Sequence, residues 1–214
     1  MGQIILDFGC GTDRYPNATA IDISDRHLTK EGDIKWDLDN YPYPLSSNYA
    51  DLIYCSHVIE HLKKPEETLR EFTRIIKPMG KIIIKVPHAS CLPATTTPVH
   101  KHNFTSCTIR PYIELASGMI TINGRIDETK KPILKVVHTQ LRPHYWNRTR
   151  TKSMQWLDMV KIPYRITLYP IFFLINKFPD FYERHFSGIF PIADIKWTLV
   201  KEYTIHLEQK RVIE

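Results

Sequence analysis

The sequence contains no pair of cysteines in a CxxC motif and no apolar run long enough to cross a membrane. Its four cysteines are scattered over 214 residues, so no spacing predicts a disulfide framework and a reducing compartment is expected. The longest apolar stretch, residues 166–175, is too short for a bilayer and is interrupted by Pro170. Residues 1–11 run directly into a strand and a glycine turn, so we expect no signal peptide. These absences favour a cytoplasmic globular domain.

Acidic residues are absent between Glu128 and Asp158, although seven basic residues occur there. Residues 1–80 carry 9 Lys and Arg against 13 Asp and Glu, whereas residues 81–214 carry 20 against 10. We therefore expect a neutral-to-acidic cofactor-binding region followed by a surface that meets an anionic partner. The basic segment is either a solvated loop or a clamp for a phosphate, a uronic acid or an RNA backbone. Basic and aromatic residues are interleaved in it at Arg142, His144, Tyr145, Trp146, Arg148, Arg150 and Lys152.

The first ninety residues alternate short apolar runs with polar connections, which is typical of an open, doubly wound α/β sheet. A helix that begins at Pro65 separates the last two runs, with acidic residues at its positive end and Arg74 and Lys77 at its negative end. Strand, helix and strand in this order predict parallel strands joined by right-handed crossovers. The expected strands are residues 3–8, 18–23, 34–38, 50–55 and 81–86.

The remaining residues lack this alternation. Residues 88–130 are rich in Pro, Thr, Ser and His and are predicted to be a long loop with a little helix. Residues 151–187 are aromatic-rich and are expected to be helical in parts. Two further strands are predicted, at residues 133–141 and at residues 195–207, the latter as a strand or a hairpin.

A glycine turn follows the first expected strand, in the sequence LDFGCGT (residues 6–12). Gly9 and Gly11 would allow the backbone to bend sharply and to approach a ligand closely. Asp22, at the end of the second strand, is placed to accept both hydroxyls of a ribose. A dinucleotide-binding fingerprint needs a third glycine, but position 14 is Arg. The pattern therefore favours an adenosine that carries an amino acid over a pyrophosphate.

Four separate blocks carry a family resemblance: LDFGCGT, AIDIS, ADLIYCSHVIEHL and EFTRIIKPMGKIIIKVPH. With these blocks in order over residues 3–90, the chain resembles class I S-adenosylmethionine (SAM)-dependent methyltransferases of the type 11 kind. The resemblance implies a Rossmann-like, doubly wound, seven-stranded sheet, mostly parallel with an antiparallel last strand, in a three-layer α/β/α fold. It also implies SAM as cofactor and S-adenosylhomocysteine as its product. The implied cofactor contacts are Asp7, Phe8, Gly9, Cys10 and Gly11 in the glycine turn, Asp22 and Ile23 at the ribose, Asp37 and Leu38 at the adenine, and Ser56 and His57 beneath the methionine and sulfonium.

Two departures from the family pattern concern the glycine turn. Asp13 stands where the family usually has glycine, and the interval from Asp7 to Asp22 is shorter than usual by about one helical turn. The first crossover helix is therefore expected to be stunted or replaced by the loop of residues 14–17. The helix that usually precedes the first strand is also missing. The cofactor would then be more exposed, or covered by another segment such as a partner subunit.

Histidines cluster in the segment SHVIEHL (residues 56–62) and shortly after it. If this segment is a helical turn, His57 and His61 share one face next to Glu60. Three interpretations are open: these residues shape the pocket, one histidine is a general base, or they bind a metal. The catalytic candidates are His57, His61 and His100, with His57 or His100 as the base. We expect no metal; in the alternative, the segment resembles the E-x-x-E-H motif of metal-dependent 2′-O-methyltransferases of small-RNA 3′ ends and of ubiquinone-type O-methyltransferases, and the ligands are His57, Glu60, His61, His100 and His102.

We interpret residues 1–214 as one methyltransferase domain, with a SAM-binding half at 1–90 and substrate-side insertions and a cap at 88–190. The expected acceptor is a hydroxyl or carboxylate of an anionic small molecule or glycan, and residues 178–202 resemble methyltransferases associated with cell-surface glycan synthesis. An RNA methyltransferase and a SAM-binding scaffold with weak or no catalysis are the alternatives. The apolar residues 161–178 predict core packing, a homodimer contact or a peripheral contact with a membrane surface.

Overall fold

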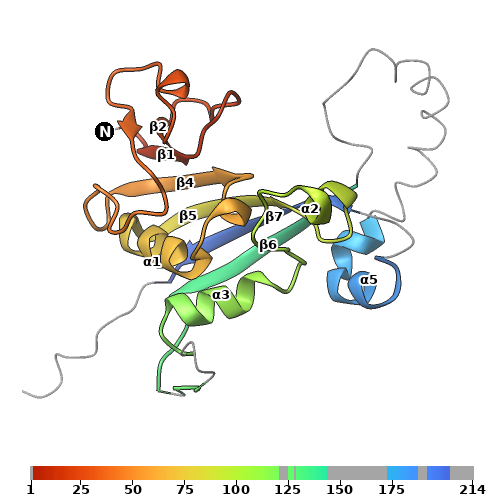
Figure 1. The fold of residues 1–214 in the computed structure, drawn as a ribbon. Helices are drawn as coiled ribbons and strands as arrows, with labels where there is room; N and C mark the ends of the chain where they lie inside the picture. The colour runs from red at the N-terminus through yellow and green to blue at the C-terminus, as the bar shows by residue number, and fades with distance from the viewer. Residues whose placement is uncertain (1, 121–124, 128, 144–172, 188–191, 203–214) are drawn as a thin grey trace, which may run out of the picture.

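The computed structural model describes residues 2–120, 125–127, 129–143, 173–187 and 192–202. Within them, one sheet contains the strands β1 (Ile5–Phe8), β2 (Thr19–Asp22), β3 (Ile34–Lys35), β4 (Ala50–Ser56), β5 (Ile76–Pro87), β6 (Leu134–Pro143) and β7 (Ile192–Lys201). Their order is β3-β2-β1-β4-β5-β7-β6 (Figure 1). The first five strands pair in parallel, whereas β7 runs antiparallel to both β5 and β6. The Rossmann-like α/β class with an antiparallel last strand is confirmed.

One amphipathic helix, α1 (Pro65–Ile75), connects β4 to β5. The sequence predicted that this helix would reach Lys77 and that the next strand would occupy residues 81–86. The helix ends two residues earlier, at Ile75, and the strand begins five residues earlier, at Ile76, because Ile76 already pairs with Ala50 and is fully buried. The strand therefore begins directly at the end of the helix.

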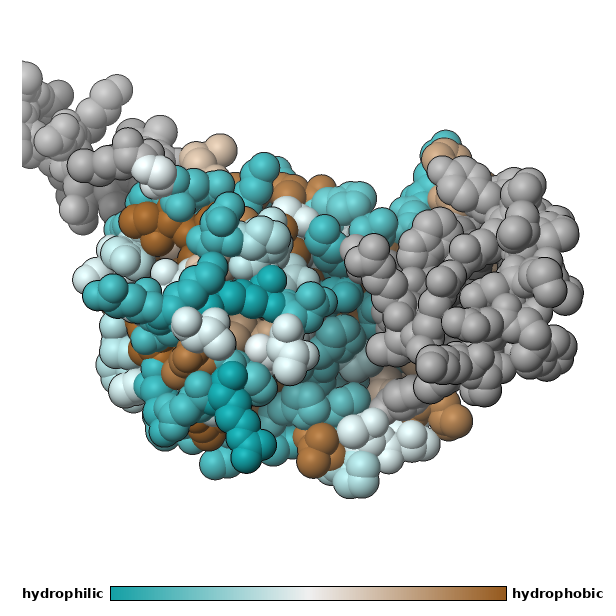
Figure 2. All heavy atoms as spheres, turned by 90° about the horizontal axis from the view of Figure 1, so that it is seen from above, coloured by the Kyte–Doolittle hydropathy of each residue, from teal (hydrophilic) through white to brown (hydrophobic). Residues whose placement is uncertain are grey.

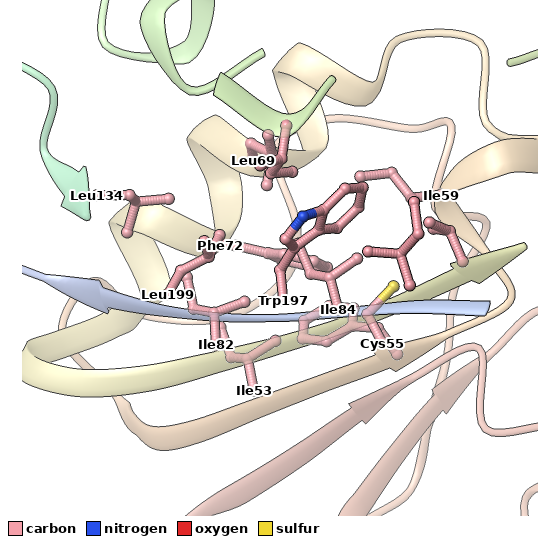
Figure 3. Close-up of a cluster of buried hydrophobic side chains, with 14 of the residues drawn as sticks. Ile53, Cys55, Ile59, Leu69, Phe72, Ile82, Ile84, Leu134, Trp197 and Leu199 are labelled. Atoms are coloured by element: carbon pink, nitrogen blue, oxygen red, sulfur yellow. The ribbon is translucent and has the colours of Figure 1, made fainter. Parts of the chain in front are cut away.

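The main core lies between α1 and the face of β4, β5 and β7 that this helix covers (Figure 3). Alternate residues of these strands point toward the helix, as the two-residue period of a strand requires. Trp197 of β7 is the largest fully buried side chain among the described residues, and its indole N–H donates to Ser106 O at 3.2 Å. The core residues labelled in Figure 3 are Ile53, Cys55, Ile59, Leu69, Phe72, Ile82, Ile84, Leu134, Trp197 and Leu199.

Residues 9–18, which are all described, connect β1 to β2 without a helix, in agreement with the short interval in the sequence. Polar contacts hold this connection instead. Asp7 accepts the backbone N–H of Tyr15 at 2.7 Å, and Arg14 forms a bidentate ion pair with Asp33. The loop that replaces the crossover helix is thus fixed by buried carboxylates.

The segment after β5 contains two short helices, α2 (Leu92–Thr96) and α3 (Ile109–Ala116), as expected for a long loop with a little helix. The helix α3 packs on α1, and α5 (Pro179–His185) lies beyond β6 in the chain. The last strand, β7, begins earlier than residue 195 and is a single strand in its described part.

Seen from above, the molecule presents mostly hydrophilic residues with scattered hydrophobic ones (Figure 2). Among the described residues, no helix has the length and apolar character needed to cross a membrane.

Candidate functional site

A pocket of about 240 Å³ opens at the carboxyl ends of β1, β2 and β4, the edge at which open parallel sheets bind ligands. Its lining comes from the glycine turn after β1, from the ends of β2 and β3, and from the segment after β4 that contains the 3₁₀ turn η2 (Ile59–His61). We call it the glycine-turn pocket. The lining residues are Gly9, Gly11, Asp22, Ile23, Trp36, Asp37, Leu38, His57, Val58, His61 and Leu62.

The two glycines of the turn have different roles. Both have a left-handed backbone, with φ of 66° at Gly9 and 49° at Gly11. A Cβ on Gly9 would lie 2.3 Å from Cγ2 of Val58, so glycine is needed for the turn to pack against the segment before η2. A Cβ on Gly11 would meet no atom within 4 Å, because Gly11 faces the open pocket. Gly9 therefore serves packing, and Gly11 leaves room for a ligand.

Asp22, at the end of β2, is held by backbone groups. Its Oδ2 accepts the N–H of Gly11 at 3.1 Å and its Oδ1 accepts the N–H of Ser24 at 2.9 Å, while His27 Nδ1 lies 3.2 Å from Oδ2. Burial alone would raise the pKa of Asp22, but the N–H groups of Ser24 and Gly11 outweigh it and lower the pKa below its usual value. The carboxylate is therefore ionised at neutral pH, and Oδ1 retains the capacity to accept a further hydrogen bond.

Four of the residues that the family resemblance assigns to the cofactor do not line the pocket: Asp7, Phe8, Cys10 and Ser56. Phe8 is fully buried against the rings of Tyr43 and Phe72, whose centroids lie 5.5 Å and 4.7 Å away. Asp7 lies behind the glycine turn, where burial raises its pKa to about 6. Burial likewise raises the pKa of the Cys10 thiol to about 11. Asp7 therefore holds the loop after β1 through the N–H of Tyr15, and Phe8 belongs to the core.

His57 leaves β4 with a left-handed backbone, φ 57°, which is uncommon for a residue other than glycine and occurs often at functional sites. Its Nδ1 lies 3.5 Å from Glu60 Oε1 and its Nε2 lies 3.7 Å from Asp194 Oδ1. The helical turn begins only at Ile59, so His57 and His61 do not share a helical face. Both nevertheless line the pocket, and His57 lies between two buried carboxylates.

The loop after α2 brings His100 next to His61, with ring centroids 4.8 Å apart. One potential ligand atom from each of Glu60, His61 and His100 lies within 4.8 Å of the others. His102 points elsewhere, with its Nε2 3.0 Å from Leu62 O. Of the five residues in the metal alternative, the structure therefore groups these three, leaves His102 apart and has His57 beside Glu60 but outside the group.

A larger pocket, of about 740 Å³, lies beside α5 and is called here the α5 pocket. His88, which follows β5 and is buried, has its Nε2 3.1 Å from Glu183 Oε1, while Arg110 and Arg184 add positive charge to the lining. No local sequence pattern pairs His88 with an acid 95 positions away. In the glycine-turn pocket, Trp36 was not predicted from the sequence. Its neighbour Asp37 was predicted, and this adjacency could have indicated Trp36 as well.

Two predicted surfaces fall largely outside the described residues. The basic segment lies there from residue 144 to residue 152, so the expected clamp has no described geometry beyond β6. The apolar segment 161–178 is described only from residue 173 onward. Within that part, Phe173 and Phe178 are exposed, so these two side chains do not belong to the core.

The methyltransferase domain family matches residues 2–159 of the chain. No curated protein sequence matches it. Among solved structures, the chain is similar to a chain of the Haloferax volcanii complex between the Trm112 methyltransferase activator and a methyltransferase. The two chains are 14% identical, the match covers 94% of this chain and 84% of that chain, and the TM-score is 0.55.

Two further structures share the fold. One is a SAM-dependent methyltransferase from Archaeoglobus fulgidus, with 17% identity, 93% and 86% coverage and a TM-score of 0.54. The other is Haemonchus contortus phosphoethanolamine N-methyltransferase 2 in complex with SAM, with 15% identity, 95% of this chain and 49% of that chain covered, and a TM-score of 0.52. Because the family matches well over half of the residues, the chain belongs to the methyltransferase domain family and is a SAM-dependent methyltransferase.

Proposed function

We propose that the chain binds SAM in the glycine-turn pocket and transfers its methyl group to a hydroxyl or carboxylate of an anionic small molecule or glycan. One observation carries this proposal. Residues expected separately to contact the methionine, ribose and adenine parts of SAM come from distant segments and line a single pocket. That pocket lies at the carboxyl edge of the sheet, where ligands of this architecture bind.

The chemistry of the lining suits SAM, which supplies an electrophilic methyl group on a positively charged sulfur when bound. Gly11 leaves open space beside the backbone, and Asp22 can accept hydrogen bonds from a ribose. Asp22 and Asp37 give the pocket negative charge that complements a cationic ligand, and Trp36 and Leu38 offer apolar surface to an adenine. The pocket is smaller than the usual range of about 300–1,000 Å³, which supports a partly exposed cofactor.

The α5 pocket is the proposed position of the acceptor. Asp194 of β7 faces His57, and the same strand accepts the backbone N–H of His88 at 2.9 Å, so β7 connects the two pockets. Arg110 and Arg184 can bind a carboxylate or phosphate of the acceptor. Their charge supports an anionic acceptor that approaches the methyl group from the β7 side.

The transfer is an in-line displacement in which the residues align the reactants. The acceptor oxygen forms a bond to the methyl carbon while the carbon–sulfur bond breaks, and the electron pair of that bond stays on sulfur. A carboxylate needs no base. A hydroxyl must lose its proton, and His57 would accept it, because the buried carboxylate of Asp194, 3.7 Å from Nε2, would stabilise the resulting imidazolium.

Calorimetric titration with SAM and S-adenosylhomocysteine tests the proposal. Asp22→Ala should weaken binding by about 1–3 kcal/mol, because the ribose hydroxyls lose their acceptor. The matched control is Asp25→Ala in the 3₁₀ turn η1 (Asp25–His27), which removes the same charge from an exposed carboxylate paired with Lys35. An unchanged affinity in Asp22→Ala would show that the ribose is held elsewhere.

The alternatives predict different results with the same protein. If the wild-type chain binds neither ligand at millimolar concentration, the scaffold alternative is favoured and our proposal is wrong. Binding of RNA that weakens steeply as salt rises would favour an RNA acceptor, since phosphate contacts release counterions.

A further inference from the structure

The turn η2 and the loop after α2 bring together three groups that can hold a cation. The potential ligand atoms of Glu60, His61 and His100 lie within 4.8 Å of one another. Ligand atoms around a tetrahedral ion with bonds of about 2.1 Å lie about 3.4 Å apart, so closure needs only small side-chain movements. The backbone ties the two segments together, because the N–H groups of Lys101 and His102 donate to Glu60 O at 2.8 Å and 3.3 Å.

Glu60 is the residue whose environment requires a partner. Its side chain is fully buried, and neither carboxylate oxygen has a hydrogen-bond partner among the described residues. The Nδ1 of His57 lies 3.5 Å from Oε1, beyond ordinary hydrogen-bond distance. Burying an unpaired carboxylate is strongly unfavourable, and a bound cation would remove that cost.

Each of the two imidazoles has its Nδ1 against a backbone carbonyl. Nδ1 of His61 lies 3.1 Å from Val99 O, and Nδ1 of His100 lies 3.0 Å from Ala94 O. A carbonyl oxygen can only accept, so each Nδ1 carries a proton, and Nε2 is the ring nitrogen left to bind an ion. Histidines that bind metals usually donate their other ring N–H in this way, which fixes the ring and makes it a better ligand.

We propose that Glu60, His61 and His100 bind a divalent transition-metal ion at the wall of the glycine-turn pocket. Two imidazoles and one carboxylate suit Zn²⁺, Mn²⁺, Fe²⁺ or Co²⁺ and leave coordination positions open. His61 lines the pocket, so an open position on the ion can bind an oxygen of the acceptor there. This role rests on the proposed function, whereas the metal site itself does not.

Titration of the metal-free full-length chain with Co²⁺, followed by visible absorption, and with Zn²⁺, followed by calorimetry, tests the site. We expect one ion per chain and a midpoint of thermal unfolding, Tm, that rises with metal. Glu60→Gln and His100→Ala should each weaken binding by about 100-fold or more and abolish the rise in Tm. Without metal, Glu60→Gln should be at least as stable as the wild type, because the substitution removes a buried charge. A purely structural role for Glu60 would give the opposite result.

Two control variants keep the test specific. His138→Ala removes an exposed histidine on β6, and His102→Ala removes a neighbour whose ring nitrogens contact Leu62 O and Tyr112 Oη. Both should bind metal like the wild type. The inference is wrong if no stoichiometric binding occurs, or if Glu60→Gln binds as tightly as the wild type. A chain that binds SAM but no metal contradicts this inference alone, and one that binds metal but no SAM contradicts only the proposed function.

Discussion

The sheet has two halves, called here its two sides, and they are built in different ways: one contains β4, β5 and β7, and the other contains β1, β2 and β3. On one side, β4, β5 and β7 have 7, 12 and 10 residues and bury apolar side chains beneath α1 and α3. On the other side, β1, β2 and β3 have only 4, 4 and 2 residues, and the described segments that join them contain no helix beyond the 3₁₀ turn η1. Apolar packing stabilises the first side, and hydrogen bonds to buried carboxylates hold the loops of the second.

This difference explains where the glycine-turn pocket lies. Loops fixed by single carboxylates leave backbone open to a ligand, while the helix-covered side supplies a rigid support. Three aspartates fix the loops of the β1–β3 side. Asp7 accepts the backbone N–H of Tyr15, and Asp22 accepts those of Gly11 and Ser24. Asp33 accepts the backbone N–H groups of Ala20, Thr29 and Lys30.

The largest expected effect comes from breaking the contact between the two sides. Phe72 of α1 is fully buried, and its ring centroid lies 4.7 Å from that of Phe8 on β1. Phe72→Ala should lower the free energy of unfolding by about 3–5 kcal/mol, measured by urea denaturation followed by circular dichroism. The control is Phe181→Ala on α5, which makes the same change at an exposed site. A similar loss in both variants would mean that the core does not join the sides as described.

A smaller loss is expected from the loop side. Asp33 accepts hydrogen bonds from Arg14 and from backbone groups, and although burial alone would raise its pKa, these contacts hold the pKa well below its usual range. Asp33→Asn should lower the free energy of unfolding by about 2–3 kcal/mol at pH 7, because the ionised acceptor is lost.

The pH dependence of that loss is a second measurement. A carboxyl whose pKa is lowered in the folded state stabilises the protein above its unfolded pKa, and this contribution falls as the pH drops toward the folded value. The difference between wild type and Asp33→Asn should therefore shrink below about pH 4. Asp25→Asn, at an exposed carboxylate paired with Lys35, should change stability by less than about 0.5 kcal/mol. Equal losses in the two variants would contradict the proposed role of buried carboxylates.

The strands were predictable because their apolar runs are short and end at turn residues. The start of β5 was not, since Pro78-Met79-Gly80 is typical of a turn. In the structure these residues form an irregularity within the strand, where Met79 has φ 64° and the register shifts between Ala50 and Leu52. A sequence pattern cannot distinguish a turn from a bulge that pairing with a neighbouring strand tolerates.

The site was predictable where one local motif specifies it. Gly9, Gly11 and Asp22 stand at fixed places after two strands, and topology alone brings them together. The approach of His100 to His61 and the burial of Glu60 depend on how the loop after α2 packs, for which the sequence has no local signal. Such groupings require the tertiary structure.

The smallest expected effect is a gain in stability, and it separates Asp7 from the other loop aspartates. Burial raises the pKa of Asp7 to about 6, from 3.8 for an ordinary aspartate, so its contribution to stability is full below pH 3.8 and is lost as the pH rises through 6. Asp7→Asn resembles the protonated form and should stabilise the chain by about 1–2 kcal/mol at pH 8, with almost no effect at pH 4. Thermal unfolding of both proteins from pH 4 to pH 8 measures this. If Asp7→Asn instead destabilises at pH 8, the ionised carboxylate and its bond from Tyr15 are stabilising, and Asp7 holds its loop in the same way as Asp33.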